Sequence, residues 1–188
     1  MTEAAFRRLL LPLVRLLSRA GVHPDVITVS GWVLSVASAF LFGLGHVQIA
    51  GAVMLAGGIL DALDGAVARE SNRMSRFGAF LDSTLDRLSE SAIFAGVIFF
   101  FASSATPWAA LLAALAMTFS LLTSYARARA EGLGVECKVG LLERAGRVAI
   151  ISILSILGFL TLALALVAAG AAITTAQRIL HVARSTRT

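Results

Sequence analysis

The chain has 188 residues, 58% of them hydrophobic, and a mean hydropathy of +0.87, which leaves room for one helical membrane domain and excludes a soluble domain beside it. The net charge of +5 comes almost wholly from arginine, since Lys138 is the only lysine. These arginines flank apolar spans, which favours lipid headgroups and phosphorylated substrates as partners over nucleic acid, and the single cysteine, Cys137, excludes an internal disulfide and a cysteine zinc site.

The first segment, residues 1–22, predicts a juxtamembrane amphipathic helix. At about 100° per residue, Arg8, Arg15 and Arg19 fall within about 40° of one another, opposite a leucine-rich face. Such a helix lies in the cytoplasmic interface with its arginines toward the lipid headgroups. Pro12 either kinks this helix or marks its true start. An ordinary basic flank of the first membrane span is the alternative that stays open.

Apolar spans follow at residues 26–45, 47–68, 78–102, 107–126 and 148–176. The connections between them alternate in charge. Those after the first and third spans carry no arginine, whereas residues 69–76 and 127–147 are strongly basic. This alternation is what the positive-inside rule predicts for external and cytoplasmic connections.

The last apolar stretch decides the number of membrane crossings. As one helix, its 29 residues would run about 43 Å, well beyond a hydrocarbon core of about 30 Å. Two helices, beginning near Leu142 and turning around residues 158–161, fit better. We therefore expect an all-α integral membrane protein in which residues 1–188 form one domain, with six transmembrane helices over residues 23–184 and both ends cytoplasmic.

Eight residue identities at fixed spacing stand out against this background. They read Asp61-x-x-Asp64-Gly65-x-x-Ala68-Arg69, then eight residues, then Gly78-x-x-x-Asp82-x-x-x-Asp86. Spacings of three and four place each pair of aspartates on one helix face. The connection between the two spans is short, so the spans are predicted to be antiparallel neighbours whose four carboxylates meet near the cytoplasmic end.

Four converging carboxylates repel one another unless cations or protons compensate them. Magnesium fits this need, because it binds a few carboxylates and completes its coordination with water and substrate phosphates. Two such ions polarise a phosphoryl group and stabilise its leaving oxygen. A structural polar network or an ion pathway is the alternative explanation of the aspartates.

The small residues of the pattern have a matching reason. Gly65, Ala68 and Gly78 let a ligand approach the backbone, and Arg69 presents a planar fork suited to a diphosphate. Tight helix packing explains each glycine equally well when it is taken alone, and a headgroup anchor explains Arg69.

The pattern resembles, without a missing letter, the signature of the CDP-alcohol phosphotransferase family. Upstream, His23-Pro24-Asp25-Val26-Ile27-Thr28 is similar to the family's Pro-Asn-x-x-Thr element, with Asp25 in place of the commoner asparagine. The resemblance implies a six-helix membrane enzyme, usually homodimeric, that displaces CMP from a CDP-linked lipid or alcohol by means of an acceptor hydroxyl.

The resemblance also implies roles for individual residues. Asp61, Asp64, Asp82 and Asp86 would hold two Mg²⁺ ions, with Mn²⁺ as a possible substitute, and Asp86 would also act as the general base. The CDP moiety would contact Pro24, Asp25, Thr28, Gly65, Ala68, Arg69, Ser75 and Gly78.

For the acceptor, a second basic group is similar to that of family members that use inositol phosphate with CDP-diacylglycerol or CDP-archaeol. Arg127, Arg144 and Arg178 would then bind the acceptor's phosphate. Positive-inside bias alone could supply several of these arginines. The alternatives are a phosphatidylglycerophosphate synthase, which uses glycerol 3-phosphate, and a small ion or proton transporter. We expect a plasma-membrane protein whose active site faces the cytoplasm.

Overall fold

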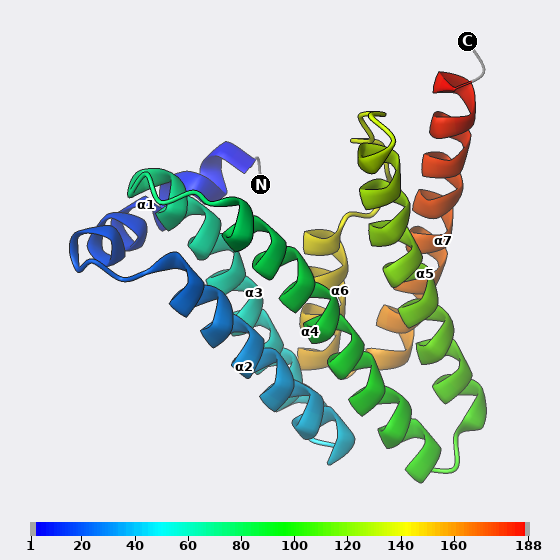
Figure 1. Cartoon of the computed structure of the whole chain (residues 1–188). Helices are drawn as coiled ribbons and strands as arrows, with labels where there is room; N and C mark the ends of the chain where they lie inside the picture. The colour runs from blue at the N-terminus through cyan, green and yellow to red at the C-terminus, as the bar shows by residue number, and fades with distance from the viewer. Residues whose placement is uncertain (1–2, 187–188) are drawn as a thin grey trace.

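The computed structural model describes residues 3–186, and the side chains from Leu11 onward, as seven helices (Figure 1). Their bounds are α1 Glu3–Arg19, α2 Pro24–Gly43, α3 Val47–Glu70, α4 Arg76–Ser103, α5 Pro107–Gly132, α6 Arg144–Ile156 and α7 Leu160–Ser185. Helices α2 to α7 run alternately down and up in Figure 1, while α1 lies across the upper end. The all-α prediction is confirmed.

Among the described helices, α2, α3, α5 and α7 are long and apolar enough to cross a membrane. Helix α4 has 28 residues but carries charged side chains along its first half. Helix α6 has 13 residues, which at about 1.5 Å per residue makes it about 20 Å long. The membrane character of the chain is therefore supported, whereas six complete crossings stay a prediction.

The division of the last apolar stretch into two helices is confirmed. Helix α6 ends at Ile156 and α7 begins at Leu160, with Gly158 in the left-handed region at φ +84°. Glycine adopts that conformation without a steric penalty. Helix α6 starts at Arg144, close to the predicted start near Leu142, and the backbone N–H of Leu142 donates to the Thr174 side chain on α7.

The predicted pairing of the two aspartate-bearing helices is wrong in one respect. Helices α3 and α4 barely touch, and each packs mainly against α2. Glycines make this possible: Gly31 of α2 faces Gly57 of α3, and Gly96 of α4 lies against the backbone of Ala39 on α2. Because α2 carries the close contacts, α3 and α4 diverge enough to leave space between their carboxylates.

Helices α5 to α7 form the other side of the bundle, with α5 packed on α4 and α7, and α6 packed on α3 and α7. The main core is a large cluster built around Phe42, Phe94 and Leu164. A smaller cluster joins Val14 of α1 to α2 and α3. Pro12 lies inside α1, and the Arg8 side chain lies outside the described residues, so the amphipathic interfacial role of α1 stays a prediction.

Candidate metal and nucleotide site

Three of the four signature aspartates come together where α3 and α4 approach their shared connection. Asp61 and Asp64 of α3 and Asp82 of α4 each offer a carboxylate oxygen, and the three oxygens lie within 4.8 Å of one another. Asp64 is buried, and the Thr28 hydroxyl of α2 donates to its Oδ2 at 2.7 Å. The backbone N–H of Gly65 donates to its other oxygen. Two donors thus fix the orientation of this carboxylate.

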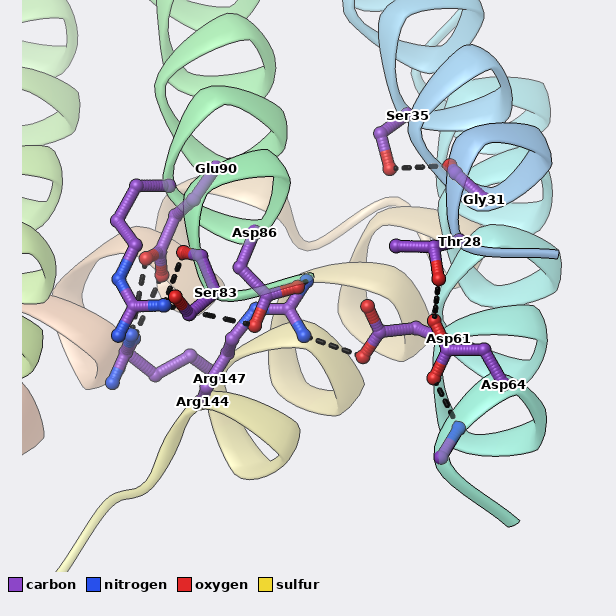
Figure 2. A network of polar contacts seen from close by, with 12 residues as sticks. Thr28, Gly31, Ser35, Asp61, Asp64, Ser83, Asp86, Glu90, Arg144 and Arg147 are labelled. Atoms are coloured by element: carbon purple, nitrogen blue, oxygen red, sulfur yellow. Dashed lines mark hydrogen bonds and ion pairs between the residues drawn. The ribbon is translucent and has the colours of Figure 1, made fainter. Parts of the chain in front are cut away.

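Asp86 joins the same network through an arginine (Figure 2). Arg144, the first residue of α6, donates through Nη1 to Asp61 Oδ2 at 2.5 Å and through Nη2 to Asp86 Oδ1 at 2.8 Å. Arg144 therefore links the aspartates of α3 and α4 to α6. The sequence predicted Arg144 as an acceptor-phosphate ligand and gave no indication of this contact with the acidic group.

These donors fit a divalent cation. Carboxylate oxygens are the ligands that Mg²⁺ and Mn²⁺ take in proteins, and three of them gathered from two helices can surround one ion. Because the oxygens sit at the end of an apolar bundle, their mutual repulsion is poorly screened, and a cation between them lowers the electrostatic energy. The donor set therefore fits a divalent metal ion on chemical grounds.

A cleft of about 460 Å³ opens beside these aspartates, between the first turn of α2, the end of α3 and the start of α4. Asp64 and Asp82 belong to its wall. The cleft also gathers every residue that the sequence predicted for the CDP moiety, namely Pro24, Asp25, Thr28, Gly65, Ala68, Arg69, Ser75 and Gly78. Arg73 and Arg76 add two further basic side chains that the sequence analysis did not select.

The start of α4 shows why one glycine of the pattern is required. Ser75 caps this helix, and its Oγ accepts a hydrogen bond from the backbone N–H of Gly78 at 2.8 Å. A Cβ atom on Gly78 would lie 3.0 Å from that oxygen and 3.4 Å from Oδ1 of Asp25. A side chain at this position would press on both neighbours and narrow the cleft.

The three predicted acceptor arginines do not form one cluster of free guanidinium groups. Arg127 is half-exposed and pairs with Glu131 at 2.9 Å. Arg178 is buried and donates to the backbone carbonyls of Val139 at 2.9 Å and Thr123 at 2.6 Å. Arg178 nevertheless lies near Arg127, because Arg178 bonds to the carbonyl of Thr123 and Thr123 is one turn before Arg127 on α5.

Arg178 belongs to a polar stripe along α7 that the sequence analysis missed. Thr174, Gln177, Arg178 and His181 all bond to backbone groups of residues 136–142, between α5 and α6. Their spacings of three, one and three place them on one helix face. That spacing was the available signal, and it predicts a helix face that holds a polar partner.

A second missed feature is a buried ion pair between α4 and α6. Arg147 donates to both carboxylate oxygens of Glu90, at 2.8 and 3.1 Å, and the two side chains are only 1% and 8% exposed. Glu90 follows Asp86 by four residues, so extending the aspartate spacing by one more turn would have found it.

Apolar helices and an acidic cleft at one end of the bundle fit a membrane protein that acts on a phosphorylated ligand. A family model described as CDP-alcohol phosphatidyltransferase matches residues 21–182, and the chain belongs to this family of enzymes.

Individual relatives narrow the comparison further. The chain is 43% identical over 143 residues to an archaetidylinositol phosphate synthase of Methanothermobacter thermautotrophicus, covering 76% of this chain and 70% of the relative. It resembles the crystal structure of a phosphatidylinositol phosphate synthase of Mycobacterium tuberculosis with CDP-DAG bound, with a TM-score of 0.83, 33% identity and coverage of 93% and 94% of the two chains. A structure of that synthase with manganese and citrate matches with a TM-score of 0.79 at 34% identity, over 91% of this chain and 87% of that one.

Proposed function

We propose that this protein transfers a phosphatidyl group from CDP-diacylglycerol, or an archaetidyl group from CDP-archaeol, to a hydroxyl of inositol phosphate and releases CMP. The acceptor oxygen forms a bond to the lipid-side phosphorus. The bond between that phosphorus and the bridging oxygen breaks, and CMP leaves with the electron pair. The proton of the acceptor hydroxyl passes to the carboxylate of Asp86.

One observation carries this proposal. The eight residues predicted for the CDP moiety line a single cleft, and that cleft shares Asp64 and Asp82 with the acidic group. A nucleoside diphosphate in the cleft would therefore meet the carboxylates with its phosphates. The likeness to a synthase with CDP-DAG bound, at a TM-score of 0.83, supports the same use of the cleft.

On the donor side, the chain's own residues bind and orient the diphosphate. Arg69 offers a bidentate fork to a phosphate. Gly65, Ala68 and Gly78 have small side chains or none, so the ligand can approach the backbone of the cleft wall. Asp61, Asp64, Asp82 and Asp86 would hold two Mg²⁺ ions, or Mn²⁺, whose charge makes CMP a better leaving group. Thr28 keeps Asp64 oriented through its hydrogen bond.

On the acceptor side, Arg144 is the central residue of the proposal, with Arg127 and Arg178 beside it. A phosphorylated acceptor carries a dianion that needs several cationic donors, whereas a free alcohol does not. Arg144 is 26% exposed on its side chain and already contacts Asp61 and Asp86. A phosphate bound by Arg144 would hold the acceptor hydroxyl close to the proposed base.

The proposal extends to the whole protein. Residues 1–188 form one domain, with residues 1–22 as an interfacial helix and residues 23–184 as a six-helix bundle in the plasma membrane. The active site faces the cytoplasm, and the protein acts as a homodimer. Helix α6 is short for a complete crossing, so its crossing requires local thinning of the bilayer.

The experiment is a panel of four acceptors given to purified protein with CDP-diacylglycerol and Mg²⁺. The acceptors are inositol phosphate, glycerol 3-phosphate, inositol and serine, and the measured product is CMP. We expect release with inositol phosphate alone, its loss with excess EDTA, and its return with Mg²⁺ or Mn²⁺. Release with glycerol 3-phosphate instead would identify a phosphatidylglycerophosphate synthase, and no release with any acceptor would contradict the proposal.

A further inference from the structure

The Glu90–Arg147 pair lies one helical turn further along α4 than Asp86 and takes no part in the proposed chemistry. Both ends of the guanidinium fork bind the carboxylate. Charged side chains inside a membrane bundle are costly and are kept where they serve a function. The two side chains are almost completely buried, so a direct role in solvent or headgroup contact is excluded.

The pair is one of two parallel links between α4 and α6 (Figure 2). Asp86 and Glu90 are one turn apart on α4, and Arg144 and Arg147 are one turn apart on α6. Arg144 binds Asp86 at 2.8 Å, and Arg147 binds Glu90 at 2.8 and 3.1 Å. Helix α6 packs mainly on α3 and α7, and these two arginines supply its ion pairs to α4 among the described residues.

The two ion pairs differ in their exposure and in the donors they leave unpaired. The side chains of Arg147 and Glu90 are 1% and 8% exposed, and Glu90 lines a cavity of about 20 Å³ together with Asp61, Asp86 and Arg144. A cavity of that size holds about one water molecule, so no acceptor reaches the Glu90–Arg147 pair through it. Arg144 is partly exposed and shared between two carboxylates, and its Nε has no hydrogen-bond partner among the described residues. Arg144 can therefore exchange Asp86 for another anionic partner, while the Glu90–Arg147 pair stays intact.

We propose that Glu90 and Arg147 are positioning residues: their buried pair holds the first turn of α6 against α4 so that Arg144 can leave the carboxylates for an acceptor phosphate without α6 moving away. This inference rests on the proposed function for the identity of the acceptor. It predicts that losing the pair weakens acceptor use and leaves donor use unchanged, because the CDP cleft is built from α2, α3 and α4.

The main test uses the double variant Glu90→Leu with Arg147→Met, since replacing both charges by apolar residues of similar volume leaves no unpaired buried charge and keeps the fold. The single variants Glu90→Gln and Arg147→Met accompany it. Their matched controls are Glu70→Gln and Arg184→Met, which change an exposed acid and an exposed arginine at helix ends. Apparent KM values are measured separately for inositol phosphate and for CDP-diacylglycerol.

We expect the double variant to raise the acceptor KM by about tenfold or more and to change the donor KM by less than about twofold. A second measurement needs no acceptor. Spin labels on cysteines replacing Leu88 of α4 and Ile153 of α6, both about half-exposed, are placed in a Cys137→Ala background. The distance distribution between the labels, obtained by pulsed electron resonance, should be narrow in the parent and broad in the double variant.

An unchanged distance distribution in the double variant would overturn the inference, whichever acceptor the enzyme uses. A broadened distribution with an unchanged acceptor KM would also overturn it, because α6 would then move without affecting the acceptor. If the parent protein releases no CMP with inositol phosphate, the proposed acceptor fails, while the distance measurement still decides the positioning role of the pair.

Discussion

Asp86 is the aspartate whose role depends most on a single neighbour. It lies apart from the three carboxylate oxygens that gather within 4.8 Å and instead accepts a hydrogen bond from Arg144. An arginine bound to a carboxylate competes with the proton that the carboxylate must accept as a base. The proposed chemistry therefore requires the acceptor phosphate to draw Arg144 away before Asp86 takes the proton.

The first prediction concerns this base. Asp86→Asn keeps the size of the side chain but removes its ability to accept a proton, so CMP release should fall by about 10²–10⁴-fold. Thermal unfolding of the detergent-solubilised variant should stay close to that of the parent. Activity within a factor of about three of the parent would rule out Asp86 as the base.

The second prediction concerns the hydroxyl that orients Asp64. Thr28→Val removes a hydrogen bond to a carboxylate, which is worth about 1.5–3 kcal/mol, and should weaken Mn²⁺ binding on the order of tenfold in a titration followed by electron resonance. Thr28→Ser is the matched control and should retain the parent affinity because it keeps the donor. Equal affinities in all three proteins would mean that Thr28 does not tune the metal site.

At the scale of elements, the polar stripe of α7 explains how residues 133–143 are ordered without secondary structure of their own. Four side chains from one helix face bond to the backbone of this segment. The residues that precede α6 are therefore held in place by α7.

The third prediction follows from that arrangement. Arg178→Ala removes the donors to two backbone carbonyls and a cationic group near Arg127, so the apparent KM for the acceptor should rise more than the KM for the CDP-lipid. The melting temperature should also fall, since buried carbonyls lose their partners. Arg184→Ala, at an exposed position of the same helix, is the control and should change neither quantity.

The fourth prediction concerns the contact between α2 and α4. A Cβ atom on Gly96 would overlap the backbone oxygen of Ala39, so Gly96→Ala should push the helices apart and destabilise the protein by about 1–3 kcal/mol. Gly132→Ala is the matched control, because a Cβ there meets nothing within 4 Å. Equal melting temperatures of the two variants would contradict this packing.

At the scale of the whole molecule, the positive-inside alternation and the helix directions agree. The connections that follow α1, α3 and α5 lie at one end of the bundle with the acidic cleft, and those that follow α2, α4 and α6 lie at the other (Figure 1). A membrane around this bundle would therefore have one basic side, and the cleft would open on it.

The fifth prediction tests that orientation. Single cysteines replacing Leu44, Glu70, Ser104 or Glu136 in a Cys137→Ala background are exposed to a membrane-impermeant maleimide in intact cells. We expect labelling at Leu44 and Ser104 and protection at Glu70 and Glu136 until the cells are opened. The reverse pattern would turn the active site to the outside and would contradict the predicted orientation.

The sequence alone determined the family, the helical architecture, the two-helix division near Gly158 and a set of residues that the fold gathers around one cleft. These features depend on local spacing: helical periodicity puts Asp61 beside Asp64, and short connections keep neighbouring spans together. Only the tertiary structure decided that α2 separates α3 from α4, that Arg144 bridges Asp61 and Asp86, and that Arg147 is paired with Glu90. The contacts of the two arginines join residues 57 to 83 positions apart in the chain. The packing of whole helices, which no local pattern encodes, selects the partner of each arginine.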